Sequence, residues 1–188
     1  MRIIAGRHRG RRLIAPPGPA VRPTGERARE ALFDILAHGR FGERPVFADA
    51  EVLDAFAGTG AFGLEALSRG ARRATFMERD RTALATLAIN VSALDETARA
   101  ILLAADATRP PRAREPCDLV FLDPPYGEDI AAPALAALAA SGWLAAGALA
   151  IIELAAKRPF APPPEFTQLH ERRYGAARLV FLRYAGRA

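Results

Sequence analysis

The tetrapeptide Asp123-Pro124-Pro125-Tyr126 combines residue types that can bind and orient a planar amine. It follows directly on the apolar run at 119–122, and a run of this kind predicts a buried strand. The tetrapeptide should therefore lie at the carboxyl end of that strand, where open α/β sheets place their ligands. Two consecutive prolines have a fixed φ and no N–H group, so they hold the Asp carboxylate and the adjoining carbonyls as rigid acceptors beside an aromatic ring. The alternative interpretation is a proline-rich surface loop.

Such acceptors suit a nucleobase amine, which is a poor nucleophile because its lone pair is delocalised into the ring. If Asp123 and the Pro124 carbonyl each accept one N–H bond of the amine, its lone pair can turn towards a donor methyl group. Tyr126 would stack on a base that has swung out of its helix. The tetrapeptide therefore predicts amine methylation, provided that the chain also binds a methyl donor.

Glycines between a strand and a helix predict a nucleotide-type ligand. Gly58, Gly60 and Gly63 satisfy the spacing G-x-G-x-x-G between an expected strand at 51–55 and an expected helix at 61–69. Glu78 ends the next expected strand, where a carboxylate can accept both hydroxyls of a ribose. NAD and S-adenosylmethionine both offer that ribose, and a turn without a ligand is the third interpretation.

Asp54 favours one of these cofactors, because a carboxylate just ahead of the glycines would repel a pyrophosphate. The same charge attracts the ammonium or sulfonium end of S-adenosylmethionine. Asp106 follows the third expected strand, where it can accept from an adenine amino group or act as a turn residue. Charge therefore favours the methyl donor over NAD.

Positive charge is concentrated at the start of the chain. Residues 1–40 hold nine arginines against three acidic residues, an excess larger than the net +5 of all 188 residues. A field of this kind suits a polyanion such as RNA or DNA, although a solvated basic arm is the alternative. The expected RNA contacts are Arg7, His8, Arg9, Arg11 and Arg12.

Metal and membrane functions are not expected. The chain has one cysteine, and its three histidines, His8, His38 and His170, are scattered rather than grouped at metal-ligand spacing. It contains no run of 18 apolar residues and no apolar leader segment at its start. We therefore expect a cytoplasmic protein without a metal, and we expect it to be a monomer.

Strands and Ala/Leu-rich helices alternate from residue 46 onwards, which predicts an α/β fold with a parallel sheet. The expected strands are 51–55, 73–77, 101–104, 117–122 and 147–153, with a terminal hairpin at 166–174 and 177–184. The expected helices are 28–36, 61–69, 81–93 and 130–140. Residues 1–21 are predicted to form a basic N-terminal β-hairpin or arm, and residues 22–188 a single domain.

Five segments together resemble a known family: RIIAG at 2–6, RPT at 22–24, RAREALF at 27–33, the loop at 54–63 and the tetrapeptide at 123–126. They are similar to the RsmD family of bacterial small-subunit ribosomal RNA guanine-N2 methyltransferases, and the match runs from residue 2 to about 127. The tetrapeptide is shared with adenine and cytosine amino-methyltransferases. The N-terminal segments are therefore what distinguishes the RsmD family from those enzymes.

The resemblance implies a class I methyltransferase fold, Rossmann-like, with a seven-stranded, mainly parallel sheet that ends in an antiparallel hairpin. It also implies S-adenosylmethionine as donor and one guanine of 16S rRNA, naked or in a partly assembled small subunit, as target. Asp123, Pro124, Pro125 and Tyr126 would hold the base. The donor would be bound by Arg22, Thr24, Asp54, Phe56, Ala57, Gly58, Thr59, Gly60, Glu78, Arg79, Asp106 and Ala107.

Three alternatives to this function remain open at the level of the sequence. A DNA adenine or cytosine amino-methyltransferase would use the same acceptor geometry, but the chain has little room for a separate DNA-reading domain. An NAD-dependent oxidoreductase could be built on the same glycine pattern. A non-catalytic RNA-binding module would use the basic arm alone.

Overall fold

The computed structural model describes residues 1–15, 26–38, 41, 45–125 and 129–186. The expected boundary of the arm at residue 21, the expected helix cap Thr24 and the expected helix end Gly39 lie outside these residues. The described part contains a seven-stranded sheet and four α-helices. It has no helix that is long and apolar enough to cross a membrane.

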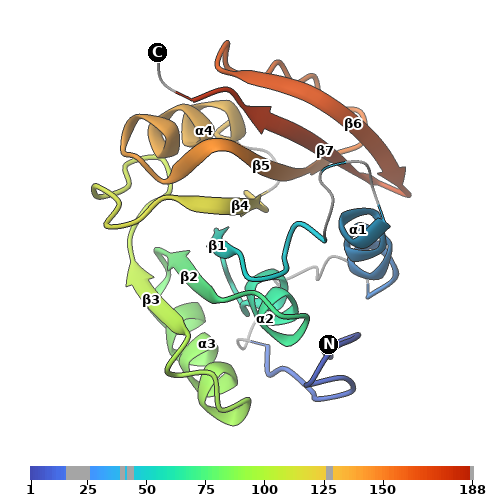
Figure 1. Cartoon of the computed structure of the whole chain (residues 1–188), viewed down its shortest axis with the longest axis vertical. Helices are drawn as coiled ribbons and strands as arrows, with labels where there is room; N and C mark the ends of the chain where they lie inside the picture. Colours follow the sequence, from blue (N-terminus) through green and yellow to red (C-terminus); the bar gives the residue numbers. More distant parts are fainter. Residues whose placement is uncertain (16–25, 39–40, 42–44, 126–128, 187–188) are drawn as a thin grey trace.

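The sheet has the strand order β3-β2-β1-β4-β5-β7-β6 (Figure 1). Neighbours from β3 to β5 run parallel, whereas β7 is antiparallel to both β5 and β6. The strands are β1 (Glu51–Ala55), β2 (Arg73–Glu78), β3 (Ala100–Ala104), β4 (Cys117–Leu122), β5 (Leu144–Ala155), β6 (Phe166–Tyr174) and β7 (Ala177–Tyr184). This is the mainly parallel sheet with an antiparallel terminal hairpin that the sequence predicted.

The helices cover both faces of the sheet because the central strands are apolar on both sides. Successive side chains of a strand point to opposite faces, so Val52 joins one hydrophobic cluster and Leu53 the other. Residues of α1 (Glu26–His38), α2 (Ala61–Ser68) and α3 (Arg81–Ala93) belong to the first cluster. Those of α4 (Ala131–Ala140) belong to the second. The central strands β1 and β4 are therefore buried between helices on both faces, whereas most of the edge strand β6 is exposed.

Strand β5 begins earlier than predicted. The sequence predicts a strand at 147–153, whereas the strand runs from Leu144 to Ala155, with Gly147 inside it at φ +79°. The register between β4 and β5 shifts between Cys117 and Leu119, which is where the extra length is absorbed as a bulge-like irregularity. Other predicted elements differ from the structure by two residues or fewer at each end.

The N-terminal arm is a tight hairpin that is docked on the core. The amide of Ile3 donates to the carbonyl of Arg11, and the amide of Leu13 donates to that of Met1. Ile3 and Leu13 are 1% and 6% exposed and belong to the same hydrophobic cluster as α2. The described arm, residues 1–15, therefore shares the core of the sheet domain. In Figure 1 it lies beside α2.

Candidate active site at the carboxyl edge of the sheet

Strand register brings the predicted site residues to one edge. Ala55 at the end of β1 is level with Met77 of β2 and with Leu122 of β4. Since these strands are parallel, the residues that follow them emerge at the same edge. The glycine loop after β1 therefore lies between Glu78 on one side and Asp123 on the other.

The glycine loop turns sharply between β1 and α2. Phe56, Gly58 and Gly60 all have positive φ, at 63°, 53° and 78°. The Gly60 amide donates to the Ala57 carbonyl at 2.7 Å. A Cβ on Gly60 would lie 2.3 Å from a methyl group of Leu87, whereas a Cβ on Gly58 would meet nothing within 4 Å. Gly60 is thus required by close packing, and Gly58 leaves its side of the loop open.

The buried carboxylate of Asp54 bonds the backbone at the end of the glycine loop. Asp54 is 1% exposed, and its carboxylate accepts from the Gly63 amide at 2.9 Å. Desolvation by burial raises the pKa of Asp54 to about 7, against the lowering effect of the Gly63 bond, and the nearby Glu78 raises it further. The buried carboxyl group at the first turn of α2 therefore changes its protonation state near pH 7.

Glu78 ties the loop to the end of β2. One carboxylate oxygen accepts from the Gly58 amide at 2.8 Å, and the other accepts from the Asp80 amide at 2.8 Å. A carboxylate offers about four lone-pair sites, so these two bonds leave acceptor capacity for a ligand. Asp80 in turn caps α3 by accepting from the Ala83 amide.

Asp106 lies after β3 and forms a local turn. Its Oδ1 accepts from both the amide and the hydroxyl of Thr108, each at 2.8 Å. These bonds lower the pKa of Asp106, with a smaller contribution from Arg79, whose guanidinium lies 3.8 Å from Oδ2. Ala107 is buried. The edge thus carries three carboxylates: Asp54 near the end of β1, Glu78 as the last residue of β2, and Asp106 just after β3.

Asp123 and Pro124 follow β4 directly, one partly buried and the other buried, while Pro125 is exposed. The strand register places Asp123 one position beyond Leu122, the partner of Ala55, and so beside the start of the glycine loop. Three predicted site residues, Tyr126, Arg22 and Thr24, lie outside the described residues.

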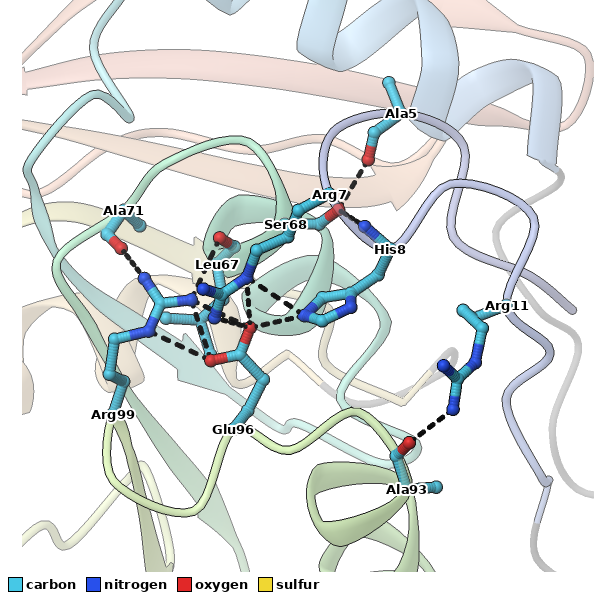
Figure 2. Close-up of polar contacts among 10 residues, drawn as sticks. All are labelled: Ala5, Arg7, His8, Arg11, Leu67, Ser68, Ala71, Ala93, Glu96 and Arg99. Atoms are coloured by element: carbon cyan, nitrogen blue, oxygen red, sulfur yellow. Dashed lines mark hydrogen bonds and ion pairs between the residues drawn. The ribbon is translucent and has the colours of Figure 1, made fainter.

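The predicted RNA contacts divide into two groups. The guanidinium of Arg7 and the imidazole of His8 both bond Glu96 Oε1, the latter at 2.7 Å. Arg99 bonds the same carboxylate at 2.7 Å (Figure 2). The Glu96 side chain is fully buried. Arg7 and His8 therefore attach the arm to the core, whatever else they contact.

Arg9, Arg11 and Arg12 are exposed. Arg11 donates to the Ala93 carbonyl at the end of α3, as Figure 2 shows. Among the described residues, the side chains of Arg9 and Arg12 form no ion pair or hydrogen bond. These arginines are the part of the arm that is available to a polyanion.

Three core residues hold the arm, a role that was not predicted from the sequence: Glu65, Asn90 and Glu96. Glu65 is fully buried and accepts from the amides of Ile4 and Ala5 at 2.8 and 3.0 Å. In the sequence, all three residues look like ordinary polar residues of a helix or a loop. The one available signal was Glu65 itself, a charged residue in the otherwise apolar segment GLEAL at 63–67, which is too hydrophobic to leave that helix face in solvent.

Comparison with known proteins decides the family. The family model described as "Conserved hypothetical protein 95" matches residues 1–183. Ribosomal RNA small subunit methyltransferase D of Haemophilus influenzae is 37% identical over 179 residues, covering 93% of this chain and 89% of its own. The protein of the same name from Escherichia coli K12 is 38% identical over 170 residues, covering 90% and 82%. The chain belongs to the RsmD family. The resemblance predicted from the sequence is thereby confirmed.

Solved structures agree on the fold. The Escherichia coli protein yhhF, described provisionally as a methyltransferase, superimposes with a TM-score of 0.85 at 35% identity, covering 100% of this chain and 99% of its own. A Haemophilus influenzae methylase gives a TM-score of 0.78 at 32% identity, covering 97% of both chains. The RsmD-family chain therefore has the class I methyltransferase fold. Among the described residues, no group of three or more His, Cys, Asp or Glu side chains is placed to hold a metal ion.

Proposed function

We propose that this protein transfers a methyl group from S-adenosylmethionine to the exocyclic N2 amine of one guanine in 16S rRNA. The observation that carries the proposal is the strand register, which sets Asp123 and Pro124 beside the glycine loop at one edge of the sheet. Membership of a family whose relatives are named ribosomal RNA small subunit methyltransferase D supports the choice of substrate.

The residues present fit the methyl donor. Gly58 leaves open space beside a loop whose Gly58 amide is held by Glu78, and Glu78 keeps acceptor capacity for a ribose. Asp54 lies next to the same loop with its pKa raised to about 7, so a cationic ligand, which stabilises the carboxylate form, is favoured over a pyrophosphate, which opposes it. When bound there, S-adenosylmethionine would supply an electrophilic methyl group on a positively charged sulfur.

Asp106 and Arg79 would border the adenine end of the donor, and Phe56 and Ala57 would border it at the start of the glycine loop, where the Ala57 amide donates to the Met77 carbonyl of β2. Asp106 keeps one oxygen, Oδ2, free of the Thr108 bonds, so it can accept from an amino group while its own turn stays intact. Arg22, Thr24 and Tyr126 are proposed from the family resemblance alone.

Asp123 and Pro124 would bind the guanine that accepts the methyl group. The Asp123 carboxylate and the Pro124 carbonyl would each accept one N–H bond of the guanine amine, which turns its lone pair towards the donor side of the edge. Pro124 is buried and has a fixed φ; its carbonyl direction is therefore preset. Tyr126 would stack on the extruded base.

The arm would hold the RNA backbone. Arg9, Arg11 and Arg12 are exposed on a hairpin that is bonded to the core at several points, so their positive charges are presented from a fixed support. Such phosphate contacts position a nucleic acid without reading its sequence. Arg7 and His8 border this surface, and Arg7 is about half exposed despite its bond to Glu96.

The competing functions have less support. A pyrophosphate of NAD would face the charge of Asp54, and a non-catalytic RNA-binding module would not need the loop geometry set by Gly60 and Glu78. A DNA amino-methyltransferase would share the chemistry, but the described chain is one sheet domain with a short arm. A cytoplasmic location and a monomeric state remain predictions that accompany an rRNA substrate.

The test is transfer of a tritiated methyl group from S-adenosylmethionine to three acceptors: naked 16S rRNA, partly assembled small subunits and double-stranded DNA. We expect label in one or both ribosomal acceptors and none in DNA. Label in DNA alone would favour the amino-methyltransferase alternative. Binding of NAD in place of S-adenosylmethionine would favour the oxidoreductase.

A further inference from the structure

Both strands of the N-terminal arm converge on one residue of the glycine loop, Thr59. The hydroxyl of Thr59 lies 3.9 Å from the sulfur of Met1, at the beginning of the arm. The Thr59 carbonyl accepts from Asn90 Nδ2 at 3.1 Å, and Asn90 also bonds the other strand of the arm at Ile14. The amide of Leu13 donates to the carbonyl of Met1 at 3.0 Å, which joins the two strands at this end.

Asn90 uses its whole amide group in this junction. Its Oδ1 accepts from the Ile14 amide at 2.8 Å, and its Nδ2 donates to the Ile14 carbonyl at 2.9 Å and to the Thr59 carbonyl. The side chain is 1% exposed. Exchanging the oxygen and nitrogen of Asn90 would set an N–H against the Ile14 amide and an oxygen against two carbonyls, so the bonding pattern fixes the orientation of the amide.

The hydrogen bond from Asn90 holds the Thr59 carbonyl, in the part of the loop that is flanked by two glycines. Thr59 stands between Gly58 and Gly60, both with positive φ, and glycines have the widest choice of backbone conformation. The loop is held by Glu78 at the Gly58 amide and by Ala57 at the Gly60 amide. The Gly60 amide and the Thr59 carbonyl belong to one peptide, so Asn90 supplies the second bond to that peptide, at its carbonyl, and Asn90 is also bonded to the arm.

The opposite end of the arm is anchored independently. The hydroxyl of Ser68 donates to the Ala5 carbonyl at 2.6 Å and accepts from the His8 amide at 3.0 Å. The Arg7 amide donates to the Ser68 carbonyl at 2.9 Å. Ser68 lies at the end of α2, whereas Thr59 precedes the beginning of that helix. The arm therefore has one set of bonds at the loop and another set a helix length away.

We propose that Asn90 is a positioning residue that makes the docked arm part of the donor site. With Ile14 in place, Asn90 holds the Thr59 carbonyl in the orientation that receives the donor; without Asn90, that peptide keeps only the bond from its N–H group, at Gly60, to the Ala57 carbonyl. Because coupling between two sites is reciprocal, donor binding should also stabilise the Ile14 end of the arm. This inference rests on the proposed function, since it assumes that the loop binds S-adenosylmethionine or its product.

The first measurement is calorimetric binding of S-adenosylhomocysteine to the full chain and to two variants, Asn90→Ala and Ser68→Ala. Both variants remove hydrogen bonds to the arm, but only Asn90→Ala removes one from Thr59. We expect Asn90→Ala to weaken binding about tenfold, within the usual range of coupling effects, and Ser68→Ala to leave the Kd unchanged. Equal Kd values for the two variants would overturn the proposal.

The second measurement needs no variant, so it holds even if Asn90→Ala does not fold. Hydrogen exchange of the arm amides is recorded with and without saturating S-adenosylhomocysteine. Exchange should slow at Ile14 and Leu13, near the loop, and change less at Arg7 and His8, which are bonded to Ser68. Unchanged exchange at Ile14 in protein that binds the ligand would contradict the coupling and leave the proposed function standing. Failure of the unaltered protein to bind S-adenosylhomocysteine would contradict the proposed function itself.

Discussion

The imidazole of His8 bonds the buried carboxylate of Glu96 at 2.7 Å, across 88 positions of the chain. Arg7 and Arg99 bond the same carboxylate, and Arg99 also donates to the Ala71 carbonyl at 2.8 Å. Glu96 therefore joins the arm to the loop that precedes β3 and, through Arg99, to the segment between α2 and β2. A predicted surface arm is in this way built into the core.

The substitution Glu96→Gln should destabilise the protein, because it removes one partner of a buried ion cluster and leaves the arginines facing a neutral group. The expected loss is on the order of 3 kcal/mol in the free energy of unfolding, measured by urea denaturation. Asp95→Asn is the matched control, since Asp95 is an exposed neighbour. A loss no larger than that of the control would show that the cluster contributes little to docking.

The substitution Asp54→Asn should change how stability depends on pH. The carboxyl group titrates at 3.8 in its ordinary state and at about 7 in the fold, so between these values the folded state binds more protons than the unfolded one. Stability from Asp54 is thus full below about pH 4 and is lost as the pH rises through about 7.

Asparagine keeps the shape of the side chain and does not titrate. Relative to Asp54→Asn, the unaltered protein should therefore lose on the order of 3 kcal/mol between pH 4 and pH 8. Urea denaturation at both pH values gives the difference. Parallel pH profiles for the two proteins would mean that the buried carboxyl does not have a raised pKa.

The substitution Asp123→Ala should reduce methyl transfer to 16S rRNA by about a thousandfold, the loss expected on removing a preorganised transition-state contact. Binding of S-adenosylhomocysteine should stay within about twofold, because the loop bonds to Glu78 and Asp54 do not involve Asp123. Asp129→Ala is the control, because the Asp129 carboxylate is 86% exposed and lies 3.8 Å from the guanidinium of Arg158. Full transfer by Asp123→Ala would remove this residue from the site.

Replacing Arg9 and Arg12 together by glutamine should weaken binding to 16S rRNA and reduce its salt dependence. Each phosphate contact on a single strand contributes about 0.7 to the slope of log K against log salt, so the slope should fall by about 1.4. Arg112 and Arg114 provide a matched control pair, because they are exposed and lie outside the arm, in the segment that precedes β4 and away from the carboxyl edge that carries the candidate site. An unchanged slope, or an equal change in the control pair, would make the arm a solvated extension.

Much of the fold could be predicted because its signals are local. Apolar runs such as 117–122 and helical repeats such as 81–93 are determined by neighbouring residues, and the glycine loop is placed by the strand and helix on either side of it. The carboxylates Glu78, Asp106 and Asp123 could be assigned to one edge because parallel strands end together.

The docking of the arm could not be predicted because it depends on contacts between distant positions. Glu96 and Asn90 look like ordinary polar residues of a helix and its following turn, and only the tertiary structure shows that they are buried against His8 and Ile14. For the same reason, Arg7 could not be distinguished from Arg9 in the sequence, although the first is bonded to a buried carboxylate.

Nucleoside mass spectrometry of 16S rRNA decides whether this protein methylates the N2 amine of a guanine in that RNA. The RNA is taken from the source bacterium after deletion of this gene, with complementation by the unaltered gene or by Asp123→Ala. We predict that one N2-methylguanosine is lost on deletion, restored by the unaltered gene and not restored by Asp123→Ala. An unchanged set of methylated nucleosides after deletion, or loss of a methylated base other than guanine, would contradict this activity.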